Sequence, residues 1–484
     1  MLNFKDAFRA SAITSIDNFM KRLISLLSMI VLARILSPED FGLVAISMLA
    51  LGFVQEATAL GGRAYLLSQK SICDDEVFTS WTIGVLVRSF FVLVLLLGSG
   101  AISDYYDDER VAPLIYAAAS VIVLEFLANP KMIYRHKAQN IVSVVKLGLF
   151  TKVCSTAVAL LVATYYETYW ALMLAHIFRA LTFTIGTYFL EPCLPRMTLV
   201  NFRPQWEFCK WFAPRSLLNF VRSQLDTFFV SSVYEKAVLG GYNSMKYYTS
   251  IPSQILISPL VGPMLTQFSE MKGNRNYLEG QLSVSLLIFF IVSFPLMSLM
   301  IIFSEPAINV VLGEKWMEYS RLFNVFSISI FSVGLTNIAI NIVYLESKTK
   351  LLPLHSLTLL IVFLAAFLIV DFEGIYELAQ LKVGIELAIS VLFFSFIITY
   401  SFSVSMLRKI ALNAVPIVLC VGISIYVYTS MDIDVTPSII SVSFNVALFS
   451  LIYLLVLSCS AKLLSQRSYE YDYLYKKSLK LFVR

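Results

Sequence analysis

The sequence has 484 residues, of which 58% are hydrophobic and 14% are charged, whereas a typical soluble domain has roughly 25% charged residues. This composition excludes a water-soluble enzyme and predicts a membrane protein. The formal net charge of +5 is explained by membrane orientation and contact with anionic lipid, so it does not indicate nucleic-acid binding.

The chain reads as a series of membrane-spanning helices. Each such helix needs about 20 mostly apolar residues, and fourteen stretches meet this requirement. The first reads as a retained helix, because no small-residue cleavage site follows a short apolar core. In chain order the predicted spans cover residues 12–33, 40–61, 77–101, 111–129, 144–165, 169–190, 209–233, 240–268, 280–303, 318–345, 351–370, 374–400, 410–429 and 437–460.

The charges of the connecting segments predict the orientation of these spans. If the N-terminus is cytoplasmic, most lysines and arginines outside the spans fall in cytoplasmic segments. The outward segments then hold only Arg34, Arg110, Lys236 and Lys315. Because short basic loops remain on the cytoplasmic side, we predict that both termini are cytoplasmic.

Two similar turns indicate an internal duplication. Residues 36–44 (LSPEDFGLV) and 234–242 (YEKAVLGGY) each contain a polar turn followed by an apolar residue and a glycine, Phe41-Gly42 and Leu239-Gly240. Lobes related by such a repeat place a cavity between them. We predict an all-α integral membrane protein with two six-helix lobes in parallel pseudo-repeat. The predicted parts are an N-terminal lobe at 1–205, a C-terminal lobe at 206–400, two further helices at 401–460 and a cytoplasmic tail at 461–484.

Two longer segments around these turns carry a family resemblance. They are residues 31–47 (VLARILSPEDFGLVAIS) and 223–244 (SQLDTFFVSSVYEKAVLGGYNS). With them, the chain resembles the polysaccharide transporter family of Wzx-type oligosaccharide flippases. This family belongs to the MOP superfamily, together with the lipid II flippase MurJ and the MATE exporters.

The resemblance implies a function and its partners. The expected substrate is an undecaprenyl-diphosphate-linked oligosaccharide repeat unit of O-antigen, capsule or exopolysaccharide. The expected activity is its movement across the bacterial inner membrane through a cationic cavity between two lobes. Contacts with the polysaccharide polymerase machinery are expected as well. No ATPase partner is implied, and the chain has no GxxxxGK[ST] motif for ATP.

Charged residues near the middle of spans are candidates for the substrate site. Arg22, Arg88, Arg179 and Arg222 lie near the middle of the first, third, sixth and seventh spans, and Lys21 adjoins Arg22. A charge at the bilayer centre costs about 2.5 to 3.5 kcal/mol, so such residues usually face a bundle interior or a water-filled cavity. We predict that these five side chains bind the anionic headgroup, because arginine pairs with phosphate bidentately. The other interpretation is that they snorkel or tie helices together.

Embedded acids are candidates for ion pairing or for ion coupling. Asp17 lies four residues before Lys21, and Asp226 lies four residues after Arg222, so each pair shares one helix face. Glu56 and Glu125 lie near helix ends. We expect Asp226, Asp17 and Glu56 to neutralise neighbouring cations or to bind a coupling ion, Na⁺ or H⁺.

Three other functions remain open from the sequence. A MATE-like exporter of cationic drugs is disfavoured by the surplus of embedded cations. An O-antigen polymerase or ligase would need a large outward loop, and the longest one predicted, 304–317, is short. The third alternative is a channel. No enzyme activity, cofactor or metal site is expected, since His136, His176 and His355 are isolated from other metal-ligand residues.

Overall fold

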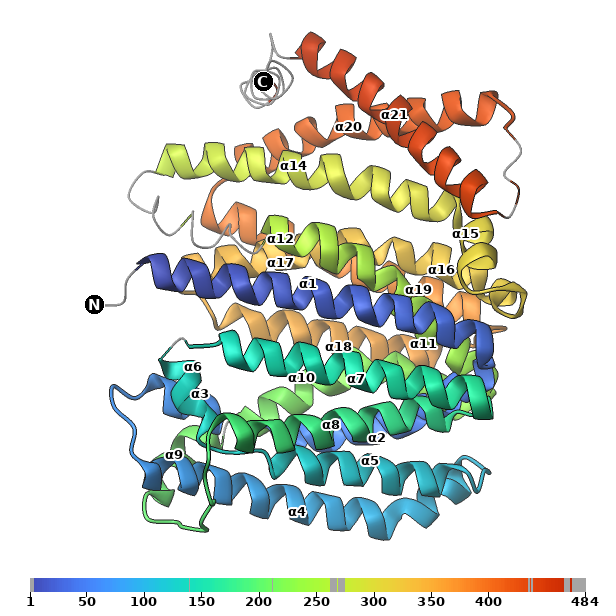
Figure 1. The fold of residues 1–484 in the computed structure, drawn as a ribbon. Helices are drawn as coiled ribbons and strands as arrows, with labels where there is room; N and C mark the ends of the chain where they lie inside the picture. The colour runs from blue at the N-terminus through green and yellow to red at the C-terminus, as the bar shows by residue number, and fades with distance from the viewer. Residues whose placement is uncertain are drawn as a thin grey trace. The chain divides into compact units, whose positions relative to one another are not determined.

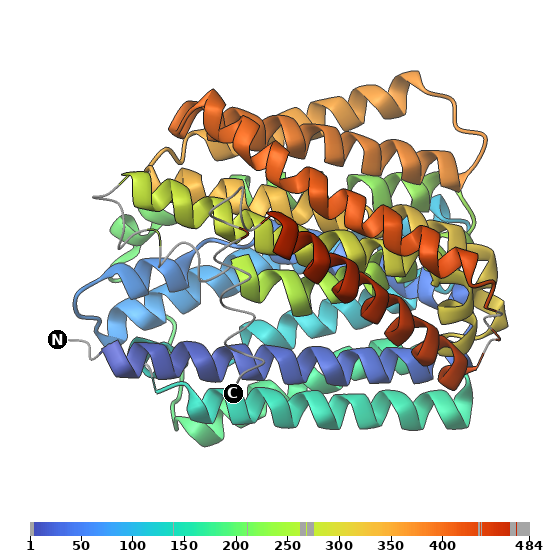
Figure 2. The ribbon, with the colours of Figure 1, turned by 90° about the horizontal axis from the view of Figure 1, so that it is seen from above.

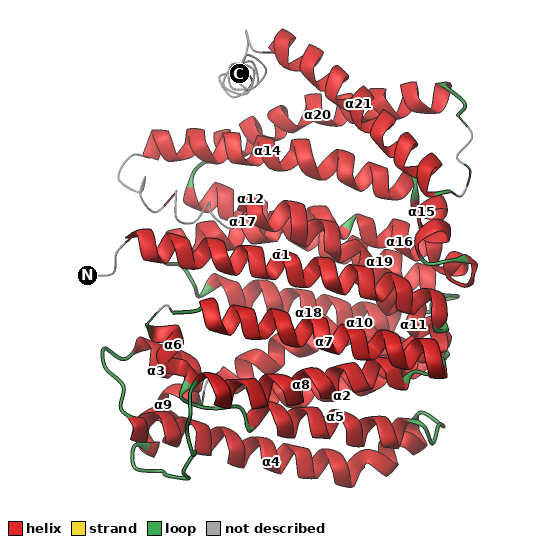
Figure 3. Cartoon of the chain, in the orientation of Figure 1, coloured by secondary structure: helices red, strands yellow, loops and turns green. Residues whose placement is uncertain are grey.

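The computed structural model describes residues 4–138, 140–210, 212–261, 268, 275–433, 436, 438–464 and 471, with side chains from residue 13 onward. Every regular element in this described part is a helix (Figure 3). Helices satisfy all of their backbone hydrogen bonds within one segment, as an apolar bilayer requires. Residue contacts divide the chain into unit 1, residues 1–243, and unit 2, residues 244–484.

Unit 1 contains long helices and three short ones. Helices α1 and α7 lie side by side in both ribbon views (Figures 1 and 2), and α7 also packs on α8. Helix α5 packs against α2, α4 and α8, and α2 packs against α10. The helices are α1 (Phe4–Ile35), α2 (Pro38–Ala57), α3 (Gly62–Ser68), α4 (Asp74–Tyr105), α5 (Val111–Phe126), α6 (Met132–Lys137), α7 (Val142–Tyr166), α8 (Trp170–Leu190), α9 (Phe202–Cys209), α10 (Phe212–Val233) and α11 (Lys236–Pro252), the last of which continues into unit 2.

Unit 2 has an apolar core between α14, α17 and α19. Its fully buried side chains include Phe289, Ile338, Ile342 and Ile397. The elements are the π-helical η1 (Ser253–Ile257), α12 (Ser258–Val261), α14 (Arg275–Ile302), α15 (Ser304–Val311), the 3₁₀ helix η2 (Glu314–Tyr319), α16 (Ser320–Ser327), α17 (Ser329–Leu345), α18 (Leu351–Ile369), α19 (Ile375–Ser401), α20 (Val404–Ser430) and α21 (Ile439–Leu464).

Ten helical segments in the described residues are long and apolar enough to cross a membrane. The predicted all-α membrane fold is therefore confirmed, while the count of fourteen spans stays a prediction. The four predicted spans outside the ten correspond to α1, α5, α10 and α11. Helix α5 is short, with 16 residues. Helices α1, α10 and α11 carry embedded charges, including Arg22 and Arg222.

The structure corrects two local expectations. Residues 304–317, treated as an outward loop, form α15 and most of η2. The eighth predicted span, 240–268, is not one continuous α-helix, because α11 ends at Pro252 and a π-helical turn follows. Proline removes a helix hydrogen-bond donor, and neighbouring π turns re-satisfy the backbone. Residues 262–267 of this span and most of the predicted tail lie outside the described residues. The lobe boundaries at 205/206 and 400/401 stay predictions.

Candidate functional site

The two candidate cations of the first span, Lys21 and Arg22, lie on α1. Lys21 Nζ is 2.7 Å from Asp17 Oδ2, and Asp17 is buried. The spacing of four residues thus forms the predicted pair. The Lys21 ammonium also reaches α7 at Gly148, where an added Cβ would lie 2.5 Å from Nζ. Arg22 is partly buried on the same helix.

The acid of the seventh span is held by a partner from the next helix. Tyr242 Oη on α11 donates a hydrogen bond of 2.8 Å to Asp226 Oδ2 on α10. Asp226 is only 3% exposed, so its carboxylate is buried one helical turn from the partly buried Arg222. One residue further along each helix, Thr227 Oγ1 and Asn243 Oδ1 lie 3.3 Å apart. The hairpin of α10 and α11 is therefore joined by polar contacts on its inner face.

Arg88 and Arg179 share an acidic neighbour that sequence reasoning had set aside. Glu125 on α5 accepts a hydrogen bond of 2.7 Å from Gln55 Nε2 on α2. Arg179 Nη2 lies 3.7 Å from Glu125 Oε1, and Arg88 is close enough for electrostatic attraction to the same carboxylate. Glu125 therefore links α2, α4, α5 and α8. The candidate Glu56 forms no ion pair with a described residue, and its neighbour Gln55 makes the contact instead.

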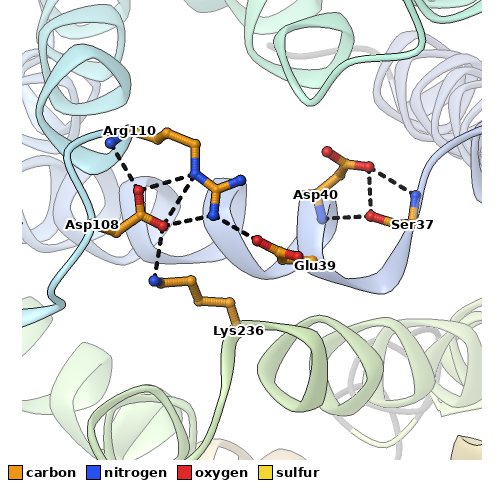
Figure 4. A network of polar contacts seen from close by, with 6 residues as sticks. All are labelled: Ser37, Glu39, Asp40, Asp108, Arg110 and Lys236. Atoms are coloured by element: carbon orange, nitrogen blue, oxygen red, sulfur yellow. Dashed lines mark hydrogen bonds and ion pairs between the residues drawn. The ribbon is translucent and has the colours of Figure 1, made fainter.

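A charged network joins three segments at the end of unit 1 that contains the turn before α2 (Figure 4). Arg110 contacts Glu39 at 2.5 Å and Asp108 at 2.8 Å. Lys236, the first residue of α11, lies 2.8 Å from the same Asp108 oxygen. The network thus ties the start of α2 and the start of α11 to the loop between α4 and α5.

Asp108 is the centre of this network electrostatically as well. Hydrogen bonds from Arg110 and Lys236 lower the pKa of Asp108 well below its usual 3.8, against the opposing effect of burial. The same contacts, from Asp108 first and then Glu39, raise the pKa of Arg110. Asp108 and Arg110 therefore remain charged at neutral pH.

The start of α2 is shaped by its own sequence. Ser37 Oγ accepts a hydrogen bond from the Asp40 backbone, and Asp40 Oδ2 accepts one from the Ser37 backbone at 2.8 Å (Figure 4). This reciprocal capping box satisfies two helix-end donors. Pro38 at the first helical position adds a fixed backbone angle suited to a helix start. The polar turn around Ser37 is therefore the N-terminal cap of α2.

The two glycines of the paired turns meet each other. A Cβ on Gly42 would lie 1.8 Å from the carbonyl oxygen of Lys236, and one on Gly240 would lie 1.8 Å from that of Pro38. Only glycine permits this approach of α2 and α11. The turns predicted to be equivalent are thus in direct backbone contact, next to the charged network.

Several basic residues predicted to be cytoplasmic pair with acids at the start of α4 and at the end of α8. Lys131 lies 2.6 Å from Asp74, and Arg196 contacts Asp75. Arg135 lies 2.9 Å from Glu191. These pairs tie the segments around α6 and after α8 together, so they have a structural role in addition to any effect on orientation.

Comparison with known proteins identifies the family. A family model described as "Polysaccharide biosynthesis protein" matches residues 31–321, more than half of the chain. The chain belongs to this family. The match to the polysaccharide biosynthesis protein family includes both glycine turns, the charged network, and Arg88, Arg179 and Arg222. Arg22 lies just before it.

Curated relatives have names that refer to polysaccharide biosynthesis and transport. The chain is 24% identical over 305 residues to the lipopolysaccharide biosynthesis protein WzxC of Escherichia coli, an alignment that covers 60% of each chain. It is 22% identical over 288 residues to the succinoglycan biosynthesis transport protein ExoT of Rhizobium meliloti, covering 59% of this chain and 58% of the relative. The matched regions thus span about three fifths of these relatives' length.

Solved structures show the fold of this polysaccharide biosynthesis protein. The lipid II flippase MurJ in an inward closed conformation matches with a TM-score of 0.74 and 15% identity, over 93% of this chain and 99% of MurJ. An inward-facing multidrug resistance MATE transporter matches with a TM-score of 0.56 and 12% identity, over 81% and 95%. The chain therefore has the fold of MurJ and the MATE transporters, as predicted, and is a multi-pass bacterial membrane protein.

Proposed function

We propose that the chain is a secondary transporter that moves undecaprenyl-diphosphate-linked oligosaccharide repeat units from the cytoplasmic to the periplasmic leaflet. The observation that carries this proposal is the family match at residues 31–321 in a chain with the MurJ fold. The names of WzxC and ExoT support a role in polysaccharide export. The activity of the whole protein, its substrate and its partners are all part of this proposal.

The cations on α1 and α10 suit the charged part of such a substrate. A diphosphate crossing the bilayer needs fixed positive partners, because an isolated charge in low dielectric is strongly disfavoured. The planar guanidinium of an arginine can contact two phosphate oxygens at once, so Arg22 and Arg222 suit this role. Lys21 is partly neutralised by Asp17 at 2.7 Å, so we assign it the smaller share of binding.

The contact between α2 and α11 would close the path on one side. We place both termini in the cytoplasm, which puts the charged network of Figure 4 at the periplasmic end. Transport by alternating access then requires the Gly42–Gly240 contact and the Asp108–Lys236 pair to separate and form again. Because the glycine contact joins the two backbones, its opening requires the starts of α2 and α11 to move apart.

The coupling ion is part of the proposal. Na⁺ or H⁺ would need an acid that changes partners during transport. Asp226 suits this role, since it is buried, accepts a hydrogen bond from Tyr242 and lies one turn from Arg222. Glu56 remains a second candidate. Contact with the polymerase that uses the exported unit is also proposed.

The alternative functions receive less support. A MATE-like exporter of organic cations shares the fold, but embedded arginines on α1, α4, α8 and α10 would repel its substrate. A polymerase or ligase would require an outward catalytic segment, and residues 304–317 are instead packed as short helices. The family match, described as a polysaccharide biosynthesis protein, supplies no observation that favours a channel.

Replacement of the two central arginines tests the proposal. Arg22→Ala and Arg222→Ala are each expected to abolish surface polysaccharide in a deletion strain while leaving the amount of membrane-inserted protein unchanged. Arg203→Ala is the matched control, because Arg203 is 91% exposed on the short helix α9, and it should restore export fully. Normal polysaccharide from both central variants would refute the assignment.

A further inference from the structure

A cavity lined by basic side chains lies wholly within unit 1. Its volume is about 360 Å³, which is within the size range of small-molecule sites. It is lined by the turn between α2 and α3, by α4, by the segment from α5 to α6, and by α9. The short helices α3, α6 and α9 gather at one end of this unit (Figure 1). The cavity lies at this end, opposite the charged network of Figure 4.

One face of α4 forms the floor of the cavity. Val77, Trp81, Gly84 and Arg88 all line it, and their spacing places them along one stripe of a helix. At 1.5 Å per residue this stripe is about 16 Å long. A Cβ added to Gly84 would meet no atom within 4 Å, so open space begins directly at the backbone there.

Three basic side chains line the cavity. They are Arg63, Arg88 and His136, and none of the described lining residues is acidic. Glu125 attracts Arg88 from outside the lining, but its ion pair is with Arg179. Burial lowers the pKa of His136, and the charge of Arg63 lowers it further. An anion in the cavity would compensate the positive charges of Arg63 and Arg88.

Two further side chains add polar and aromatic character. Gln205 is 0% exposed, and its Nε2 donates to the Glu76 carbonyl oxygen at 2.8 Å. Its Oε1 has no hydrogen-bond partner among the described residues, so it can accept from a ligand hydroxyl. Trp81 is held by a hydrogen bond of 2.9 Å from Nε1 to the Phe126 carbonyl oxygen. A fixed indole is a suitable wall for a sugar or glycerol moiety.

We propose that this cavity binds the phosphate ester of a hydroxylated headgroup, with Arg63 and Arg88 on the phosphate and Gln205 on a hydroxyl. Two membrane lipids carry this chemistry: the lipid-linked sugar diphosphate and phosphatidylglycerol. The inference deepens the proposed function and rests on it only for the first of these sources. This site is distinct from the arginines on α1 and α10.

Filling the cavity tests the proposal. Gly84→Leu inserts an apolar side chain into the open space at the floor, and Gly98→Leu is its control on the same helix, where an added Cβ also meets nothing within 4 Å. Arg88→Gln removes a charge from the site, with Arg203→Gln as the exposed control. The full chain is purified in detergent, and native mass spectrometry measures binding of undecaprenyl-diphosphate-N-acetylglucosamine, phosphatidylglycerol and phosphate-free diacylglycerol.

The expected result is one bound phosphate lipid whose affinity falls at least ~10-fold in Gly84→Leu and in Arg88→Gln, equivalent to ~1.4 kcal/mol. Both controls should bind like the wild type. The lipid whose binding is lost in the cavity variants is the one that supplies the phosphate ester. Unchanged binding in both cavity variants, or equal binding of diacylglycerol, would overturn the inference. If Arg22→Ala and Arg222→Ala export normally while Gly84→Leu loses lipid binding, the proposed substrate site on α1 and α10 is refuted. The assignment of this cavity as a phosphate-lipid site would still hold.

Discussion

Replacing Gly240 with alanine perturbs the contact between α2 and α11 at a single atom. The new Cβ would start 1.8 Å from the Pro38 carbonyl oxygen, and contacts below 3.0 Å are essentially never seen for a real Cβ. The helices must therefore separate locally by at least about 1.2 Å. Forcing an extra group into a tight contact costs ~1–3 kcal/mol. Alanine also favours the helix by up to ~1 kcal/mol over glycine, so the net loss is smaller.

A matched variant separates the effect of the close contact on stability from the effect of helix propensity. Gly100→Ala on α4 gains the same propensity, but its Cβ meets nothing within 4 Å, so it should be neutral or slightly stabilising. Thermal unfolding of the purified full chain, followed by tryptophan fluorescence, should show Gly240→Ala less stable than Gly100→Ala. Gly42→Ala should behave like Gly240→Ala. Equal melting temperatures for all three variants would refute the close backbone contact.

Four further predictions concern polar contacts in unit 1. Tyr242→Phe removes the hydrogen bond to the buried Asp226 and should cost ~1–3 kcal/mol of unfolding free energy. Asp226→Asn should abolish export in the polysaccharide assay even where protein level is normal, and full export by Asp226→Asn would exclude it as a coupling group. A double-mutant cycle with Asp108→Asn and Lys236→Gln should give a coupling energy of about 1 kcal/mol, since Asp108 is only 7% exposed. Because the pKa of Asp108 is lowered in the folded state from its usual 3.8, its contribution is present above that usual value and is lost as the solution becomes more acidic. The stability difference between wild type and Asp108→Asn should therefore be constant from pH 5 to pH 8, and a change across that range would contradict this ionisation.

Local patterns in the sequence were sufficient to predict where most helices lie and which residues contact each other within one helix. The second span was predicted to begin at residue 40, and α2 begins at Pro38, where Ser37 and Asp40 form its capping box. The spacing of Asp17 and Lys21 predicted their pair. Such features depend on neighbours three or four residues apart, so the sequence alone contains the necessary information.

Contacts between distant segments could not be predicted in this way. Gln55 and Glu125 lie 70 positions apart, and no periodicity indicates that an acid near a helix end joins four helices. The glycines of the two turns were interpreted as equivalent positions of a repeat, and their direct contact is a property of helix packing. The cavity floor at Gly84 was missed for the same reason, although an isolated glycine in an apolar helix often marks a packing or functional feature.

The sidedness of the lipid-linked repeat unit tests the central claim most directly. In a strain that lacks this gene, the account predicts that these units accumulate in the cytoplasmic leaflet, where a membrane-impermeant glycan-modifying enzyme reaches them in inverted vesicles and not in spheroplasts. Wild-type protein should restore periplasmic exposure, while Arg222→Ala should not. Repeat units that are exposed on the periplasmic face of the deletion strain as fully as in the wild type would contradict the account.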